Sequence, residues 1–398
     1  MNKLRRPLAS AWHRVRDAQQ HLFYNRRFPV TNARTIRALR EFASATDRKE
    51  AGQIRHELQV SRDYWRCEPF FYYRYGLYRR DRLLTDEQLR QYVPEYVFFT
   101  LYFPLYNASP LANVISNKIA CSLLFDSVGI RRAQPVGFSL KGALYDAQMH
   151  RVDEAGFLQL VDRQRGRRVF IKPEDGKGGQ GVLALDVSES GIMQDSGGGP
   201  MKGEDLLRRC QMTDMILERG LVQREEINRI HASSVNTFRI ATECVKGRAR
   251  ILYSSLRIGT GSKVVDNFCQ DGLVAGVDSL DGHYLPVAFN QWNTTYRSHP
   301  ESGFVFEGNR VEAWSEISAF VLEAAERLPF YRHLGWDIAL SVDGPVAIET
   351  NLGWGVDLPH LLFGGLRDMM RFPEPKVLWK TYQQRFSRQG PLPERGEG

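Results

Sequence analysis

Cysteine is scarce in this sequence, with five residues in a chain of 398. The five are Cys67, Cys121, Cys210, Cys244 and Cys269, and no two of them have the short spacing typical of a structural zinc site. An odd number of scattered cysteines also argues against a disulfide framework. We therefore expect reduced thiols and a cytoplasmic protein.

Long apolar segments are missing as well. The longest runs from Tyr96 to Tyr106 and contains Pro104, and it is much shorter than the ~20 residues that a membrane-spanning helix needs. It is better explained as a buried element of a globular protein. The N-terminal residues are basic, but no apolar stretch follows them, so we expect no cleaved signal peptide.

Acidic residues are under-represented only near the N-terminus. Residues 1–100 contain 20 Lys and Arg against 11 Asp and Glu, whereas the other 298 residues contain 34 against 35. Apolar residues recur there at helical spacing, which predicts a mostly helical, basic N-terminal extension over residues 1–84. Such a surface can place a cytoplasmic protein at an anionic membrane, although a solvated helical face is the simpler explanation. Nucleic acid is a less favoured partner, and the sequence does not indicate an oligomeric state.

From Asn117 onward, strand and helix patterns alternate. Short apolar segments predict strands at 168–172, 182–186, 215–223, 237–244, 250–257 and 273–278, and helical periodicity predicts helices at 118–127, 203–211, 311–328 and 361–370. This mixture predicts an α+β fold. The polar residues 386–398, rich in Pro and Gly, are expected to form a disordered tail.

A glycine-rich loop follows one of the predicted strands. The strand ends in Lys172, and residues 176–181 contain four glycines in six positions, Gly176, Gly178, Gly179 and Gly181. Glycine lets the backbone approach a ligand closely, and successive N–H groups in such a turn can bind phosphate. A lysine at the strand end can reach the same phosphate oxygens. The pattern matches neither a Walker A loop nor a GxGxxG fingerprint, and a flexible surface hairpin is the alternative.

A second pattern brings oxygen ligands together near the C-terminus. Two apolar runs flank Asp343 and Gly344, which predicts a β-hairpin. If its turn is centred on Asp343, Asp337 and Glu349 lie directly opposite each other, and Asn351 points to the same face. Two carboxylates and an amide oxygen at one point suit Mg²⁺. A two-residue turn at Asp343-Gly344 would shift the pairing by one residue and put the two acids on opposite faces. Solvated acids on an exposed hairpin are the alternative.

Taken together, residues 85–370 resemble the ATP-grasp superfamily, and specifically its sugar-transfer-associated branch. The resemblance implies a fold in which two α+β lobes clasp ATP. It would place the ATP-grasp domain at residues 85–385, with a smaller lobe carrying the glycine loop at about 130–222 and a metal-binding lobe at 223–385.

The resemblance also implies site residues. Lys118 and Lys172 are similar to the two nucleotide lysines, and the four glycines to the flap over the phosphates. The strand 215–223 resembles the hinge that contacts adenine and ribose, with Glu218, Leu221 and Val222 as candidates. Residues 234–240 resemble an Asn-Thr-x-Arg strand that supplies Asn236 for cofactor binding and Arg239 for catalysis. Asn267 would lie near the metal, and Asp337, Glu349 and Asn351 would be the magnesium ligands.

The function that the resemblance implies is an ATP- and Mg²⁺-dependent ligase. It would activate a small-molecule carboxylate as an acyl phosphate for attack by an amine, including an amino sugar, or by a thiol. Lys172 and Arg239 would be the catalytic residues. Polysaccharide or cell-envelope sugar modification is the expected context. A phosphotransferase on the same fold is the main alternative, followed by a non-catalytic nucleotide-binding module, and His299 is a candidate acceptor-side residue.

Overall fold

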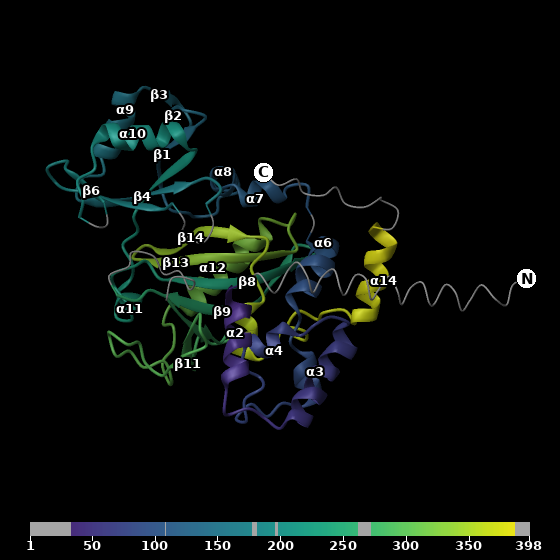
Figure 1. Cartoon of the computed structure of the whole chain (residues 1–398). Coiled ribbons are helices and arrows are strands. Elements are labelled where there is room, and N and C mark those ends of the chain that lie inside the picture. The colour runs from purple at the N-terminus through teal and green to yellow at the C-terminus, as the bar shows by residue number, and fades with distance from the viewer. Residues whose placement is uncertain (1–32, 108, 177–180, 196–197, 262–271, 387–398) are drawn as a thin grey trace, which may run out of the picture. The chain divides into compact units, whose positions relative to one another are not determined.

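The structure is a computed structural model, and it describes residues 33–107, 109–176, 181–195, 198–261 and 272–386. Gly178, Gly179 and Asn267, and the expected tail apart from its first residue, lie outside these ranges. The chain divides into two compact units (Figure 1). We call residues 1–105 and 355–398 the helical unit, and residues 106–354 the two-sheet unit.

The described part of the helical unit consists of helices and turns. Its helices are α2 (Ala33–Ser44), α3 (Ala51–Trp65), α4 (Phe70–Arg74), α5 (Asp86–Arg90), the π-helix η1 (Val97–Tyr102), α13 (Asp357–Phe363) and α14 (Pro375–Phe386), and α6 (Phe103–Tyr106) crosses the boundary. Their core is aromatic, with Phe71 and Tyr72 packed against Leu58 and Leu89. The segment Tyr96–Tyr106 contributes buried residues, as expected, including Phe98 and Tyr102.

The two-sheet unit begins with short helices and a seven-stranded sheet. The helices are α7 (Ala112–Ser116) and α8 (Lys118–Ser127), and the strand order is β3-β2-β1-β7-β4-β5-β6. The strands are β1 (Pro135–Leu140), β2 (Ala143–Asp146), β3 (Arg151–Val152), β4 (Arg167–Pro173), β5 (Leu183–Val187), β6 (Met193–Asp195) and β7 (Met215–Arg219). Residues of α9 (Glu154–Asp162) and α10 (Gly203–Met212) share one core with Val169 and Ile171 of β4, so these helices cover one face of this first sheet (Figure 1).

The second sheet also has seven strands, in the order β12-β11-β10-β9-β8-β13-β14. They are β8 (Thr237–Val245), β9 (Arg248–Ile258), β10 (Leu273–Val277), β11 (Tyr284–Asn290), β12 (Thr295–Tyr296), β13 (His333–Ser341) and β14 (Gly344–Asn351). Helix α12 (Trp314–Glu326) packs against β8, β9, β13 and β14, and the short α11 (Glu225–Asn228) precedes β8. Both sheets are antiparallel in every pairing of named strands that the structure describes. The α+β prediction is confirmed.

Most of the expected elements are present at nearly the expected positions. The helix expected at 361–370 is wrong, because α13 runs from Asp357 to Phe363 and ends at Gly364, which has φ +71°. Glycine adopts this left-handed conformation without the steric cost that other residues meet, and so it terminates the helix. Within the described ranges, no helix combines the length and apolar character needed to cross a membrane.

The β13–β14 hairpin pairs Asp337 directly with Glu349, as predicted, but by a different route. Ser341 pairs with Gly344, so Val342 and Asp343 form a two-residue turn. Continued without interruption, this register would place Glu349 on the face away from Asp337. The register shifts between Asp337 and Ile338, so that Ile348 is the extra residue of a β-bulge. The bulge restores the pairing that places both carboxylates on one face.

Candidate nucleotide and metal site

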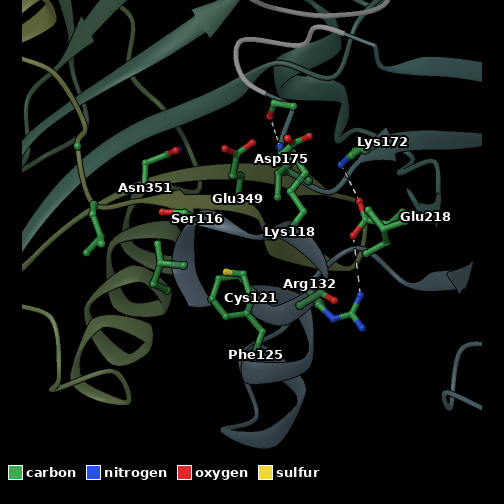
Figure 2. Close-up of a pocket in the computed structure, with 17 residues that line it drawn as sticks. Ser116, Lys118, Cys121, Phe125, Arg132, Lys172, Asp175, Glu218, Glu349 and Asn351 are labelled. Carbon is green, nitrogen blue, oxygen red and sulfur yellow. Dashed lines mark hydrogen bonds and ion pairs between the residues drawn. The ribbon is translucent and has the colours of Figure 1, made fainter. Parts of the chain in front are cut away.

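A cavity of about 270 Å³ in the two-sheet unit brings together residues from α8 and both sheets (Figure 2). Its lining includes Lys118 of α8, Lys172 and Glu218 of the first sheet, and Glu349 and Asn351 of the second. These residues are far apart in the sequence. All five were candidates on sequence grounds, and the structure places them at one site.

Strand register explains how Lys172 and Glu218 enter the cavity. Phe170 of β4 pairs with Glu218 of β7, and Lys172 pairs with Ile216. Because side chains alternate along a strand, these four residues lie on the face opposite the helix-covered core of Val169 and Ile171. Lys172 Nζ lies 2.6 Å from a Glu218 oxygen, and an Arg132 nitrogen lies 3.8 Å from the other. Figure 2 shows the two cations beside this carboxylate.

The N-terminus of helix α8 is hydrogen-bonded to the residues that begin the glycine loop. Its N-cap is Asn117, whose side chain accepts a hydrogen bond from the Ala120 N–H at 2.9 Å and donates one to the Glu174 carboxylate at 2.7 Å. The Lys118 N–H donates to the Glu174 carbonyl at 2.9 Å, and Lys118 Nζ donates to the Gly176 carbonyl. The lysine is therefore held beside the residues that follow β4, where the glycine loop begins.

On the second sheet, Asp337 lies between an arginine and a carboxylate. It pairs with Arg239 of β8 on one side and with Glu349 of β14 on the other. Asp337 is 4% exposed, and its two oxygens lie 3.0 Å from Arg239 Nε and 3.1 Å from Arg257 Nη2. The contact with Arg239 is an ion pair that lacks hydrogen-bond alignment, since Asp337 Oδ1 has no hydrogen-bond partner.

The residues proposed as magnesium ligands fit a hard cation in their chemistry. Asp337 Oδ1 is a buried oxygen without a hydrogen-bond partner. Among the residues that the structure describes, none forms a hydrogen bond or ion pair with the side chain of Glu349 or Asn351, and both side chains line the cavity. Two carboxylates and an amide oxygen are ligands that Mg²⁺ accepts together with substrate phosphates. Asp337 differs from the other two in that guanidinium groups already neutralise its charge.

Arg257 is a functional candidate that sequence reasoning missed. It lies on β9, pairs with Asp337 and donates to the Thr237 hydroxyl at 3.1 and 2.7 Å. Together with Arg239 it places two guanidinium groups beside one carboxylate. The available signal was a charged residue between the apolar Leu256 and Ile258 near the end of the strand.

Arg132 was missed as well, and the structure holds it firmly. Its guanidinium donates to both Asp126 oxygens, at 2.9 and 2.6 Å. Arg132 lines the first cavity and also a second one of about 700 Å³ in the same unit. Arg132 is therefore part of the wall of both cavities.

The structure does not bring every predicted residue to the first cavity. Asp337 and Arg239 do not line it, and Asp337 is connected to it only through its pairing with Glu349. Leu221 and Val222 line the second cavity. Asn236 is fully buried and bonds to Gln223, to the His231 carbonyl and to the Gly259 N–H. Asn236 thus joins the segment before β8 to the end of β9.

Of the described loop glycines, Gly176 lines the cavity and Gly181 has φ +72°. Cys121 also lines the cavity, where burial raises the pKa of its thiol to about 12. A protonated thiol is a poor nucleophile, so Cys121 is not a candidate for covalent catalysis.

A family model described as sugar-transfer associated ATP-grasp matches residues 98–369. The chain belongs to this ATP-grasp family. Its two-lobed ATP-grasp fold and helical N-terminal region therefore agree with the expectation from sequence. A search among curated proteins found no significant match.

Solved ATP-grasp enzymes resemble the chain only distantly. D-alanine–D-alanine ligase from Bacillus anthracis is 12% identical, with 69% of this chain and 73% of that chain covered and a TM-score of 0.36. Biotin carboxylase from Campylobacter jejuni, in a β-γ-ATP complex, is 10% identical, with 66% and 47% covered and a TM-score of 0.39. Two further matches, a biotin carboxylase domain from Hydrogenobacter thermophilus and an N5-carboxyaminoimidazole ribonucleotide synthetase, are covered over 47% and 45% of their length. The chain thus spans about half of those proteins.

Proposed function

We propose that this protein is an ATP- and Mg²⁺-dependent ligase that activates a carboxylate as an acyl phosphate for attack by an amine or thiol. The observation that supports this most directly is the cavity that Lys118 and Lys172 share with Glu349 and Asn351. Ammonium groups suit the phosphates of ATP, and the carboxylate and amide oxygens suit the accompanying Mg²⁺. The family description supports a sugar-related substrate in polysaccharide or cell-envelope modification.

On the first sheet, the groups that would bind phosphate are Lys118, Lys172 and the loop that starts at Gly176. Lys172 is paired with Glu218 at 2.6 Å. The pair keeps the ammonium in the cavity, and ATP phosphates would compete with Glu218 for it. Glu218, Leu221 and Val222 belong to the segment proposed to contact adenine and ribose.

On the second sheet, Asp337, Glu349 and Asn351 would hold Mg²⁺, which when bound supplies positive charge to the phosphates. Arg239 would stabilise the charge of the transferred phosphoryl group, and Asp337 orients its guanidinium. A substrate carboxylate oxygen attacks the γ-phosphorus and ADP leaves. The amine or thiol then attacks the carbonyl carbon, loses its proton, and inorganic phosphate leaves.

Oxygen labelling distinguishes this ligase from a phosphotransferase. The full chain is incubated with ATP, Mg²⁺ and pairs of uronic acids with amino acids or amino sugars, and products are identified by mass. For a productive pair, ¹⁸O in the carboxylate should appear in the released phosphate, because one carboxylate oxygen leaves with it. A phosphorylated product with no labelled phosphate would establish the phosphotransferase instead. Glu323→Gln, on the exposed side of α12, is the control for substitutions in the site.

The basic residues 1–84 are proposed to contact anionic membrane surfaces. The support is their charge imbalance, since electrostatic attraction to anionic lipid adds to any apolar contact. The full chain should sediment with phosphatidylglycerol vesicles at low salt, and not with phosphatidylcholine vesicles or at high salt. Equal behaviour with both lipids would contradict the proposal.

A further inference from the structure

Two histidines and a glutamate form a cluster in the two-sheet unit that the proposed ligase does not use. His231 lies between α11 and β8, and His299 and Glu301 lie in the segment between β12 and α12. One potential ligand atom from each of the three residues lies within 4.8 Å of the other two. The histidines are 5% and 1% exposed, and their ring centroids are 5.3 Å apart. None of the three lines the cavity with Glu349.

His299 has the hydrogen bond that orients many metal-bound histidines. Its Nε2–H donates to the Gly259 carbonyl at 3.1 Å, which leaves the Nδ1 lone pair available. That lone pair accepts only long contacts of 3.4 Å from the Glu301 and Ser302 N–H groups within the described residues. A ligating histidine commonly donates its other ring N–H to a backbone carbonyl in this way.

Hydrogen bonding does not account for the burial of His231. Its Nε2 has no partner, and its Nδ1 lies 3.4 Å from Glu301 Oε2, beyond the usual range for a hydrogen bond. A buried polar group without a partner calls for an explanation, and an ion is one of the standard explanations. The ring also packs closely on Gly259, where a Cβ would lie 2.9 Å from His231 Cδ2.

Glu301 supplies the negative charge and the flexibility that the cluster needs. Its Oε1 accepts from the Gly261 N–H at 2.5 Å, and its other oxygen faces His231. The side chain is 46% exposed, so it can adjust while the histidines remain fixed. Ligand atoms about 2.0–2.1 Å from a tetrahedral zinc ion lie roughly 3.3 Å apart, and the distance of 3.4 Å between His231 Nδ1 and Glu301 Oε2 is already close to that spacing.

We propose that His231, His299 and Glu301 bind one divalent transition-metal ion, with zinc as the expected occupant and the fourth position open to solvent. Imidazole nitrogens favour zinc over magnesium, so this site is distinct from the one proposed at Glu349. The ion would join the segment before β8 to the segment after β12. It would lie near Gly259, which follows the end of β9 and comes two residues after Arg257.

The test is zinc binding by the full chain. Metal-free protein is titrated with Zn²⁺ by calorimetry in excess Mg²⁺, which occupies the sites that prefer oxygen ligands. One zinc ion should bind per chain, and Glu301→Gln should weaken its affinity at least about tenfold, as loss of a ligand would. His299→Gln should weaken binding as well. His283→Gln and Glu307→Gln are the controls, since His283 pairs with Asp281 at the surface and Glu307 is an exposed carboxylate outside the cluster.

Cobalt gives a readout independent of activity. Co²⁺ bound at this site should produce visible absorption bands typical of four-coordinate cobalt, and Glu301→Gln should shift or remove them. The proposal is overturned if wild type and Glu301→Gln bind Zn²⁺ equally well while both are folded. It is also overturned if His283→Gln removes the binding, which would identify surface adsorption at the His283–Asp281 pair.

Discussion

Both units of the molecule bury charged side chains, but they satisfy them differently. In the helical unit, Lys49 and Glu57 are 1% and 3% exposed and lie 2.8 Å apart, and the Tyr72 hydroxyl donates to Glu57 at 2.5 Å. A second network joins Arg74 to Asp357 and Glu95, each at 2.7 Å. Each of these charges is paired with an opposite charge inside the unit, and Lys49, Glu57 and Arg74 are the buried ones among them.

In the two-sheet unit, the polar and charged side chains in and next to the cavity are paired incompletely. Lys172 and Glu218 form a pair, but Glu349 and Asn351 have no side-chain partner among the described residues. Asp337 is intermediate, because two arginines neutralise it and yet its Oδ1 has no hydrogen bond. A closed network of opposite charges stabilises the structure, whereas an open one beside a cavity leaves side chains available to a ligand. Substitutions in the closed network should therefore lower the unfolding free energy, and substitutions in the open one should lower ATP turnover.

Asp337→Asn should have the largest combined effect. It leaves Arg239 and Arg257 beside a neutral group, and removing one partner of a buried ion pair typically costs about 3–5 kcal/mol of unfolding free energy. It also removes a proposed metal ligand, so ATP turnover should be lost. Urea unfolding and an ATP consumption assay measure the two effects. A variant with wild-type stability would show that the arginines do not depend on this carboxylate.

Glu57→Gln should affect stability alone. The substitution leaves Lys49 buried without a counter-charge, with a similar expected loss of about 3–5 kcal/mol. ATP turnover per folded molecule should stay at the wild-type level, because the pair belongs to the helical unit. The comparison fails if turnover falls more than the folded fraction, as measured by circular dichroism.

Glu349→Gln should show the reverse pattern. No described residue depends on its charge, so the unfolding free energy should change by no more than about 0.5 kcal/mol, as for ordinary surface substitutions. ATP turnover should fall by roughly 10²–10³-fold, the loss seen when one group is removed from a charge-stabilising site. Glu323→Gln should leave both quantities unchanged. Destabilisation comparable to that of Glu57→Gln would show that the Glu349 carboxylate is structural.

The sequence predicted the pairing of Asp337 with Glu349 but not its cause. Alternation of apolar residues locates strands, but it does not reveal a bulge, because the extra residue at Ile348 is also apolar. The turn at Val342 and Asp343 therefore shifts the pairing by one residue from the predicted register, and the bulge compensates for this shift. The family motifs named Lys118, Lys172 and Glu218 as candidates, but they did not show that Lys172 and Glu218 form an ion pair.

Long-range association was not accessible to sequence reasoning. Residues 355–398 group with the N-terminal part of the chain, and no local pattern records which distant segments pack together. Arg257 acquires its role only because β9 pairs with β8 and β8 with β13. Asn236 lies in a recognised motif, yet its hydrogen bonds are fixed by loops that the motif does not describe.

Acid should destabilise both units because each contains a buried neutral histidine. The expected loss of unfolding free energy is smaller than for the ion-pair variants. Burial lowers the pKa of His360 to about 4 and that of His333 to about 3. The folded state keeps both rings neutral, whereas the unfolded chain binds protons below about pH 6.5. Stability is therefore lost as the pH falls from 6.5 toward these values. Each histidine contributes about 1.4 kcal/mol per pH unit, or about 2 kcal/mol by pH 5.

His360→Gln isolates the contribution of the helical unit. A neutral glutamine cannot take up the proton, so the difference in unfolding free energy between pH 7 and pH 5 should shrink by about 2 kcal/mol relative to wild type. His56→Gln is the matched control in the same unit, because the His56 side chain is 62% exposed. Urea unfolding of the three proteins at both pH values gives the comparison. An unchanged pH dependence in His360→Gln would mean that the proton reaches His360 without unfolding, and that this buried network is less closed than its contacts indicate.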